Sequence, residues 1–155
     1  MAHLQVSAIV PGPRSEVFDL ICAPSQLPYL LADHIEVQVT RSADVLKRGS
    51  EYEFLMTRFG FSQAVCLRIE DYLKGSRLTY RQSEGLFADW VHTIKFEDHG
   101  EQQTLVIDYV DYKLPFGLVG YLADDLFVRR DMKRILSHRL DLAQKAFIGK
   151  SVKKA

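Results

Sequence analysis

The chain has 155 residues, of which 47% are hydrophobic and 26% are charged, as is typical of one globular domain with a hydrophobic core. Twenty Lys and Arg residues balance twenty Asp and Glu residues, so no overall charge attracts the protein to nucleic acid or to an anionic membrane surface. The N-terminal residues lack a basic leader, and no segment reaches the roughly 18–20 apolar residues that span a bilayer, so we expect a soluble cytoplasmic protein without stable membrane insertion.

The N-terminal segment predicts a strand followed by two short helices. Apolar and polar residues alternate over residues 3–10, and Pro11-Gly12-Pro13 ends the strand. Ser15 is a candidate N-cap for a helix that stops near Ala23-Pro24, and a second short helix is expected over residues 25–31. Two helices this short predict a cap over one end of a sheet rather than a helix bundle.

The middle of the chain predicts an antiparallel sheet. From His34 onward, apolar residues recur at every second position. Closely spaced turn signals separate the runs, which favours hairpins over strands joined by crossover helices: these are Arg48-Gly49-Ser50, Phe59-Gly60-Phe61, Lys74-Gly75-Ser76 and Glu84-Gly85. Asp71-Tyr72 interrupts the alternation and predicts a β-bulge.

The last two predicted strands bring a histidine and an aspartate together. When the segments of residues 85–98 and 104–117 are paired symmetrically about Gly100, His92 lies opposite Asp108, Trp90 opposite Val110, and Ile94 opposite Val106. The sequence therefore predicts a His and an Asp facing each other in an otherwise apolar wall.

A long amphipathic helix follows Leu114-Pro115-Phe116-Gly117 and is predicted to run to about Phe147. Its apolar face is predicted to contain Leu122, Leu126, Met132, Ile135, Leu136, Leu142 and Ala143. It is the only element large enough to cover a sheet of about seven strands. We therefore predict an α+β helix-grip fold for residues 1–148, with a curved seven-stranded antiparallel sheet around the C-terminal helix and a flexible tail over 149–155. A curved sheet cannot follow a straight helix along its whole length, so a cavity is expected between them.

Several kinds of chemistry find no support in the sequence. Cys22 and Cys66 lie far apart without metal-ligand spacing and are predicted to be buried thiols. We find no Gly-rich phosphate loop, no GxSxG elbow and no HExxH motif. We therefore expect no cofactor and no metal. His99 and His138 are predicted to be solvated.

The chain also resembles a known superfamily. Its order of elements, and above all a set of local sequence patterns, resembles the START, polyketide-cyclase and pollen-allergen superfamily (SRPBCC), in a largely uncharacterised bacterial branch. These patterns are Gly85-Leu86-Phe87, Trp90-Val91-His92-Thr93, Phe96-Glu97-Asp98, Asp108-Tyr109-Val110-Asp111-Tyr112, Leu114-Pro115-Phe116-Gly117 and Arg139. The resemblance implies a helix-grip fold and a cavity for a hydrophobic ligand. Members bind lipids, quinones or aromatic molecules, and a minority cyclise or dehydrate polyketides.

Three polar residues are the main candidates for chemistry at this cavity. A carboxylate such as Asp108 beside the His92 imidazole fixes its tautomer and raises its basicity, as a general base requires. The same contact also satisfies two polar groups in an apolar wall, and this structural interpretation is favoured. Arg139 is placed to reach Asp108 or an acidic head group of a ligand. A structural tie between helix and sheet is the favoured role.

The remaining candidates for ligand contact are larger side chains. Tyr80, Trp90 and Tyr112 are predicted to project into the grip, and Met56 and Met132 to line it or fill it. Phe59, Phe61 and Phe116 lie on predicted loops, where they would flank the mouth of the cavity. Each of these residues has an alternative role as ordinary core or turn structure.

Three functions remain open. The first is a non-catalytic carrier of a hydrophobic small molecule, acting as a monomer or weak homodimer. The second is a cyclase or dehydratase that uses His92 and Asp108 on a polyketide-like or aromatic substrate. The third is an accessory protein whose cavity is filled by its own side chains.

Overall fold

A computed structural model of the protein describes residues 1–43, 45–115 and 127–154. The strands are β1 (Ala2–Val10), β2 (Glu36–Arg41), β3 (Glu51–Arg58), β4 (Phe61–Leu73), β5 (Arg77–Glu84), β6 (Asp89–Asp98) and β7 (Thr104–Lys113). The helices are α1 (Arg14–Cys22), the 3-10 turn η1 (Pro24–Gln26), α2 (Leu27–Leu31) and α4 (Arg129–Lys154). The predicted order of strand, two short helices, six strands and long helix is confirmed.

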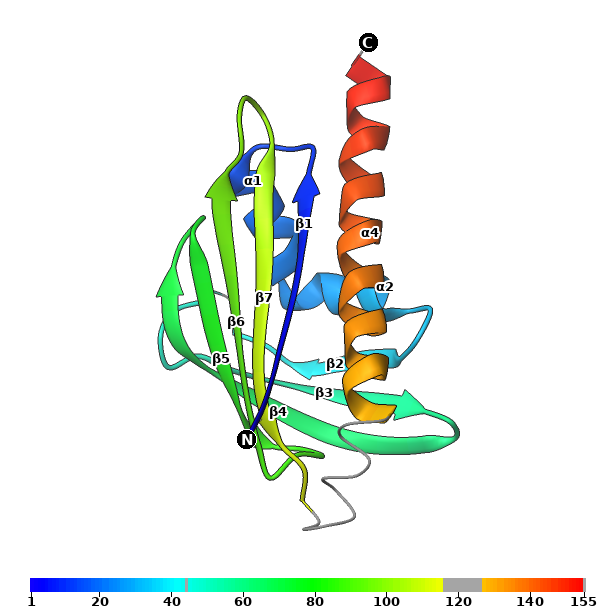
Figure 1. The fold of residues 1–155 in the computed structure, drawn as a ribbon. Helices are drawn as coiled ribbons and strands as arrows, with labels where there is room; N and C mark the ends of the chain where they lie inside the picture. Colours follow the sequence, from blue (N-terminus) through cyan, green and yellow to red (C-terminus); the bar gives the residue numbers. More distant parts are fainter. Residues whose placement is uncertain (44, 116–126, 155) are drawn as a thin grey trace.

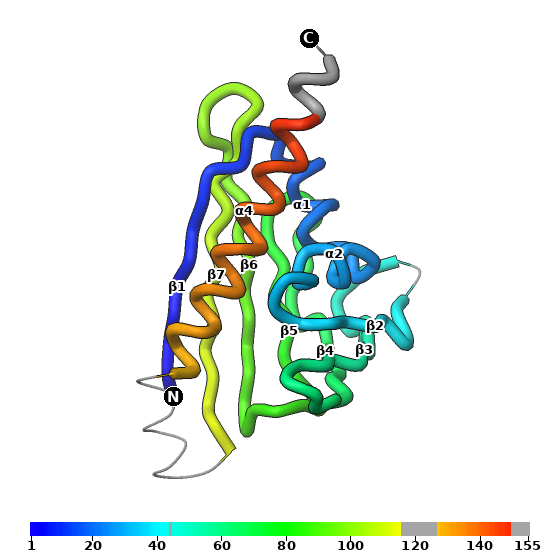
Figure 2. Tube along the Cα trace, turned by 90° about the vertical axis from the view of Figure 1, so that its right-hand side faces the viewer, coloured from blue at the N-terminus to red at the C-terminus, as the bar shows by residue number. Residues whose placement is uncertain are grey.

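The strands form one antiparallel sheet in the order β1-β7-β6-β5-β4-β3-β2. Figure 1 shows this sheet bending so that β3 runs nearly across the direction of β1 and β7. In the turned view, α4 lies beside β1, with α1 and α2 on the same side of the sheet (Figure 2). The protein thus has the α+β helix-grip fold that the sequence predicts. None of the helices among the described residues is both long and apolar enough to cross a membrane.

Breaks in the strand pairing accompany the bend of the sheet. The pairing of β4 with β5 shifts between Ile69 and Asp71, which confirms the predicted bulge. A second shift occurs between Cys66 and Leu67. The β3–β4 connection is a two-residue turn in which Phe59 (φ 53°) and Gly60 (φ 79°) both have positive φ, the geometry that matches the twist of paired strands.

The β6–β7 hairpin has a different register from the predicted one. His92 lies opposite Val110, Trp90 opposite Tyr112, and Ile94 opposite Asp108. The connection between Asp98 and Thr104 is centred on Glu101, not on Gly100, because Gly100 and Gln102 both adopt positive φ in a five-residue loop. Moving the centre by one residue shifts each pair by two, so every side chain stays on its predicted face.

The helix boundaries also differ in detail from the prediction. α1 begins at Arg14 with Pro13 as its N-cap, so Ser15 lies inside the helix and is not its cap. α4 continues to Lys154, past the end predicted near Phe147. Leu122, Leu126, Phe116 and Gly117, assigned to the helix or its approach, lie outside the described residues. Both cysteines are buried, as predicted.

Gly12 allows α4 to approach the end of β1. A Cβ atom at this position would lie 2.3 Å from the Phe147 ring, closer than any ordinary contact. We therefore expect Gly12→Ala to lower the free energy of unfolding by about 1–3 kcal/mol, measured by urea denaturation. Gly149→Ala is the matched control, because a Cβ there meets nothing within 4 Å and alanine favours the helix. A Gly12→Ala protein as stable as wild type would contradict the close packing.

Candidate functional site

A cavity of about 470 Å³ lies between the sheet and the first half of α4. This volume is in the range of small-molecule sites, roughly 300–1,000 Å³. Two groups of packed core residues lie next to it. One group extends from β1 and α1 across the sheet to Phe147, and the other joins Leu4, Val110 and Tyr112 to Met132 and Leu136. Both groups of packed core residues therefore contribute side chains to the cavity wall.

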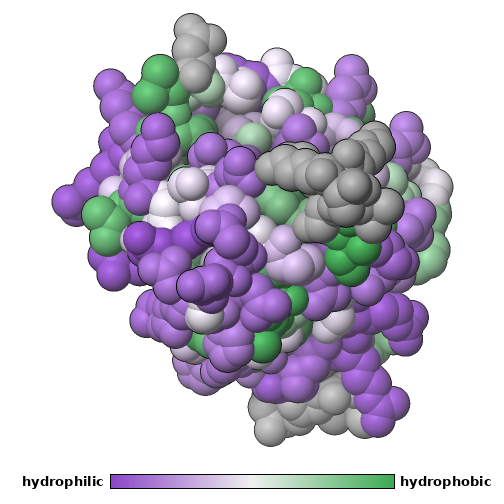
Figure 3. Space-filling view, turned by 90° about the horizontal axis from the view of Figure 1, so that it is seen from above, coloured by the Kyte–Doolittle hydropathy of each residue, from purple (hydrophilic) through white to green (hydrophobic). Residues whose placement is uncertain are grey.

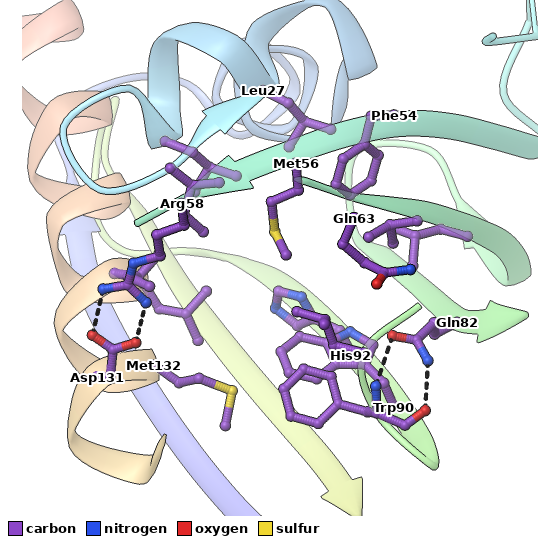
Figure 4. Close-up of a pocket in the computed structure, with 18 of the residues that line it drawn as sticks. Leu27, Phe54, Met56, Arg58, Gln63, Gln82, Trp90, His92, Asp131 and Met132 are labelled. Atoms are coloured by element: carbon purple, nitrogen blue, oxygen red, sulfur yellow. Dashed lines mark hydrogen bonds and ion pairs between the residues drawn. The ribbon is translucent and has the colours of Figure 1, made fainter. Parts of the chain in front are cut away.

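The wall is mainly apolar. Figure 4 shows Met56 extending into the cavity from β3 and Met132 from α4. The apolar and aromatic lining residues are Leu27, Leu31, Ile35, Tyr52, Phe54, Met56, Phe59, Phe61, Val65, Leu67, Tyr80, Leu86, Phe87, Trp90, Leu114, Val128, Met132, Ile135 and Leu136. The polar lining residues are Arg58, Gln63, Gln82, His92, Asp131 and Arg139.

The residues predicted to contact a ligand fall into three groups. Six line the cavity: Met56, Tyr80, Trp90, His92, Met132 and Arg139. Asp108 and Tyr112 are fully buried and lie outside the lining, Asp108 in contact with His92 and Tyr112 beside Trp90. Phe116 lies outside the described residues.

A chain of buried polar side chains connects the sheet to α4 at the wall of the cavity. The Tyr80 hydroxyl contacts His92 Nδ1, and His92 Nε2 lies 2.6 Å from Asp108 Oδ1. The same carboxylate oxygen accepts a hydrogen bond from the Arg139 guanidinium. His92 and Asp108 meet diagonally across the two strands, which the shifted register still permits because diagonal neighbours are within reach of long side chains.

The pKa shifts of Tyr80, His92 and Asp108 show which of these side chains carries each proton. Burial lowers the pKa of His92 below its usual 6.5, against the opposing effect of Asp108, so the imidazole is neutral. Burial alone would raise the pKa of Asp108, but Arg139 and His92 together lower it below the usual value. Burial raises the pKa of Tyr80. Tyr80 therefore donates to Nδ1 of the neutral His92, and Nε2–H donates to the ionised Asp108.

The lowered pKa of His92 predicts a pH-dependent stability. Between 6.5 and the lower folded-state pKa, the unfolded chain binds a proton that the folded protein excludes. The free energy of unfolding should therefore fall as the pH is lowered from 7 to 5, by at most about 1.4 kcal/mol per pH unit from this residue. Urea denaturation at each pH measures it. His92→Gln, which cannot titrate, should lack this part of the decrease, and an unchanged slope would contradict the assignment.

An ion pair that the sequence did not predict joins the β3–β4 hairpin to the first turn of α4. Arg58 contacts both carboxylate oxygens of Asp131, with Nη2 lying 2.7 Å from Oδ1, and both residues line the cavity. Figure 4 shows the pair on the side of the cavity toward the helix. The Arg58 guanidinium also lies over the Phe59 ring, 4.6 Å from its centroid. The pair closes one side of the cavity between hairpin and helix.

The rim of the cavity carries exposed aromatic side chains. Phe59 is 75% exposed and Phe61 81% exposed, yet both also line the cavity. Leu86, on the β5–β6 connection, is exposed at the same rim. By contrast, the face seen from above in Figure 3 is mainly hydrophilic, with apolar side chains in small separate groups. Exposed apolar side chains of the β3–β4 turn therefore also form part of the cavity wall.

His138 is not the fully solvated residue that the sequence predicted. It contacts the Asp33 carboxylate, and its ring lies edge-on to that of His34, with the ring centroids 5.0 Å apart. The apolar periodicity of α4 places His138 on the polar face, but α2 and the residues after it cover that part of the helix. Across the described ranges, no cluster of His, Cys, Asp or Glu has an arrangement that would hold a metal ion.

Comparisons with known proteins support the fold. A crystal structure of a protein from Thermus thermophilus is 18% identical, has a TM-score of 0.77, and covers 97% of this chain and 99% of its own. A Chromobacterium violaceum protein is 16% identical with a TM-score of 0.74, covering 94% and 97%. Ginseng (Panax ginseng) major latex-like protein 151 is 19% identical with a TM-score of 0.59, covering 86% and 95%. No protein-family model matches the chain, and no curated protein sequence matches it significantly. At these identities, the likeness establishes the helix-grip fold.

Proposed function

We propose that this protein binds and carries a hydrophobic small molecule, such as a lipid, quinone, aromatic or polyketide-like compound, in the cavity between the sheet and α4. The observation that carries the proposal is the cavity itself, about 470 Å³ in volume and lined mostly by apolar side chains. Transfer of an apolar molecule from water to such a wall is favourable, at about 25 cal/mol per Å² of apolar surface buried. A cavity of this volume favours a bound ligand over the third interpretation, in which the protein's own side chains fill the cavity.

The polar lining supports binding rather than catalysis. The two ring nitrogens of His92 are both engaged, Nδ1 with Tyr80 and Nε2 with Asp108. Neither nitrogen is therefore free to accept a proton from a substrate in the cavity. The wall instead offers polar groups held by a network of hydrogen bonds, which suits them to orient a ligand.

The proposal is tested with N-phenylnaphthylamine, a neutral fluorescent probe that is dark in water. Trp90 is the single tryptophan of the chain and lines the cavity, so excitation of Trp90 should transfer energy to a probe bound there. We expect saturable probe fluorescence on excitation of Trp90, with a dissociation constant on the order of micromolar. A folded protein that gives no saturable signal would overturn the proposal.

A second candidate function is a cyclase or dehydratase, favoured by one observation. Tyr80 lines the cavity and belongs to the hydrogen-bonded chain with His92 and Asp108, so its hydroxyl is positioned to exchange a proton with a substrate. Catalysis through this chain requires turnover of a polyketide-like or aromatic substrate that disappears in His92→Ala while ligand binding is kept. If His92→Ala loses binding and turnover together, or keeps turnover, then Tyr80, His92 and Asp108 do not have this catalytic role.

A further inference from the structure

Arg139 lines the cavity and carries a buried hydrogen-bond donor without a partner. Arg139 is only 3% exposed, lines the cavity from α4, and donates from Nη2 to Asp108. Its Nε has no hydrogen-bond partner within the described part of the chain. A buried donor without an acceptor costs about 1–3 kcal/mol. A ligand whose acceptor atom reached this nitrogen would remove that cost.

The charge of Arg139 is already balanced. Asp108 is fully buried, contacts the guanidinium directly and stays ionised beside it. His92, the other buried neighbour of Asp108, is neutral. The cluster of Arg139, Asp108, His92 and Tyr80 therefore carries no net charge. A ligand that meets this wall finds a hydrogen-bond donor but no unbalanced positive charge.

The other cation of the wall is balanced in the same way. Arg58 is held by both oxygens of Asp131 at the side of the cavity. Among the described lining residues, Arg58 and Arg139 are the only Lys or Arg side chains, and each has its own carboxylate partner. An anionic head group would therefore enter as an unpaired charge in an apolar cavity. Such a charge is far more costly to bury than a neutral polar group.

Tyr80 completes the polar contact that a neutral head group needs. Its hydroxyl proton is directed to His92 Nδ1, and its oxygen, which also faces the Arg139 guanidinium, has lone pairs for an acceptor contact at the cavity wall. Arg139 and Tyr80 together offer a donor and an acceptor close to the same cluster. A carbonyl oxygen satisfies the donor, and a hydroxyl group satisfies both.

We infer that the cargo is a neutral amphipathic molecule with a carbonyl or hydroxyl group at its buried end, held by Arg139 and Tyr80, and not a carboxylate or another anion. This inference rests on the proposed function, because it specifies the ligand class of the same cavity. The apolar body of the molecule extends from that cluster toward Phe59 and Phe61 at the rim. Both the head-group contacts and the apolar wall contribute to its affinity.

The test compares four ten-carbon ligands that differ only at one end: a primary alcohol, a methyl ester, a carboxylate and the plain alkane. Each displaces N-phenylnaphthylamine from the wild-type protein at pH 8, where the carboxylate is ionised. We expect the alcohol and the ester to bind at least about tenfold more tightly than the carboxylate. Both should also bind more tightly than the alkane. A carboxylate that binds as tightly as the ester, or an alkane that binds as tightly as the alcohol, would overturn the inference.

The variant Asp108→Asn tests the charge argument directly. It keeps the shape of the side chain and an acceptor for Arg139, but removes the balancing negative charge. The affinity ratio should shift by about tenfold or more toward the carboxylate, and the carboxylate should raise the melting temperature of this variant more than the alcohol does. A folded variant with an unchanged ratio would overturn the role of Arg139. If the variant does not fold, the wild-type series still decides.

The outcomes separate this inference from the proposed function. A folded wild-type protein that binds neither the probe nor any of the four ligands contradicts the carrier function, and the ligand class fails with it. A protein that binds the probe and the ligands, but without preference for the neutral polar ends, keeps the carrier function and refutes the ligand class alone.

Discussion

Replacing Asp108 by alanine is expected to lower the free energy of unfolding by about 3–5 kcal/mol. Asp108 is fully buried and is the carboxylate partner of both Arg139 and His92. Its removal leaves the guanidinium charge of Arg139, itself only 3% exposed, without compensation in the interior. Urea denaturation at pH 8 measures the loss, with circular dichroism as the probe of folding.

A double variant separates the charge from the packing. Asp108→Leu combined with Arg139→Met removes both charges and keeps apolar volume, and replacing a buried ion pair in this way is often neutral or stabilising. We expect the double variant to be more stable than Asp108→Ala, even though it carries more changes. If it is less stable than the single variant, the loss arises from packing and not from the unpaired Arg139 charge.

Replacing Met56 by tryptophan is expected to abolish ligand binding, with a loss of affinity of about 30-fold or more. Met56 lies on β3, and its side chain extends into the cavity. A larger indole in that position occupies the space of the ligand without displacing packed core. The free energy of unfolding should therefore change by less than about 1.5 kcal/mol. Because a second tryptophan complicates energy transfer, binding is measured by direct excitation of the probe.

Met56→Leu is the matched control for this variant. It nearly preserves the side-chain volume and should keep both the stability and the ligand affinity. Wild-type affinity in a folded Met56→Trp protein would show that the ligand binds elsewhere. The denaturation curve shows whether Met56→Trp is folded. Loss of binding counts only in the folded variant.

The fold is predictable from this sequence because each level of pattern agrees with the others. Alternation of apolar residues from β2 to β7, turns at Gly49, Gly60 and Gly75, and a single long amphipathic segment permit few arrangements. The three glycines indeed adopt positive φ. The hairpin register was less predictable, because the position of a turn centre depends on loop dihedral angles that alternation does not encode. Because the register error was two residues, each side chain stays on its predicted face of the sheet, and His92 still contacts Asp108.

Site residues were predictable where the alternation of a strand or the periodicity of a helix determines which way a side chain faces. Tyr80, Trp90 and His92 lie on the inner face of adjacent strands, and Met132 and Arg139 on the covered side of α4. The pairing of Arg58 with Asp131 was not predictable, because it joins residues 73 positions apart at the ends of two elements. Gln63 and Gln82 were missed because isolated polar residues in strands normally indicate an exposed face. The sequence does contain a weak indication: Gln63 lies two residues from Val65, and Gln82 two residues from Tyr80, so each shares the strand face of a cavity-lining residue.

The central claim is that the cavity between the sheet and α4 holds a hydrophobic small molecule. Native mass spectrometry tests it most directly, on wild-type protein and Met56→Trp, each exposed to a total lipid extract of bacterial cells and compared with unexposed protein. We predict an adduct of defined mass on the wild-type protein that is absent from the folded Met56→Trp variant. No adduct on folded wild-type protein, or the same adduct on both proteins, would contradict the account.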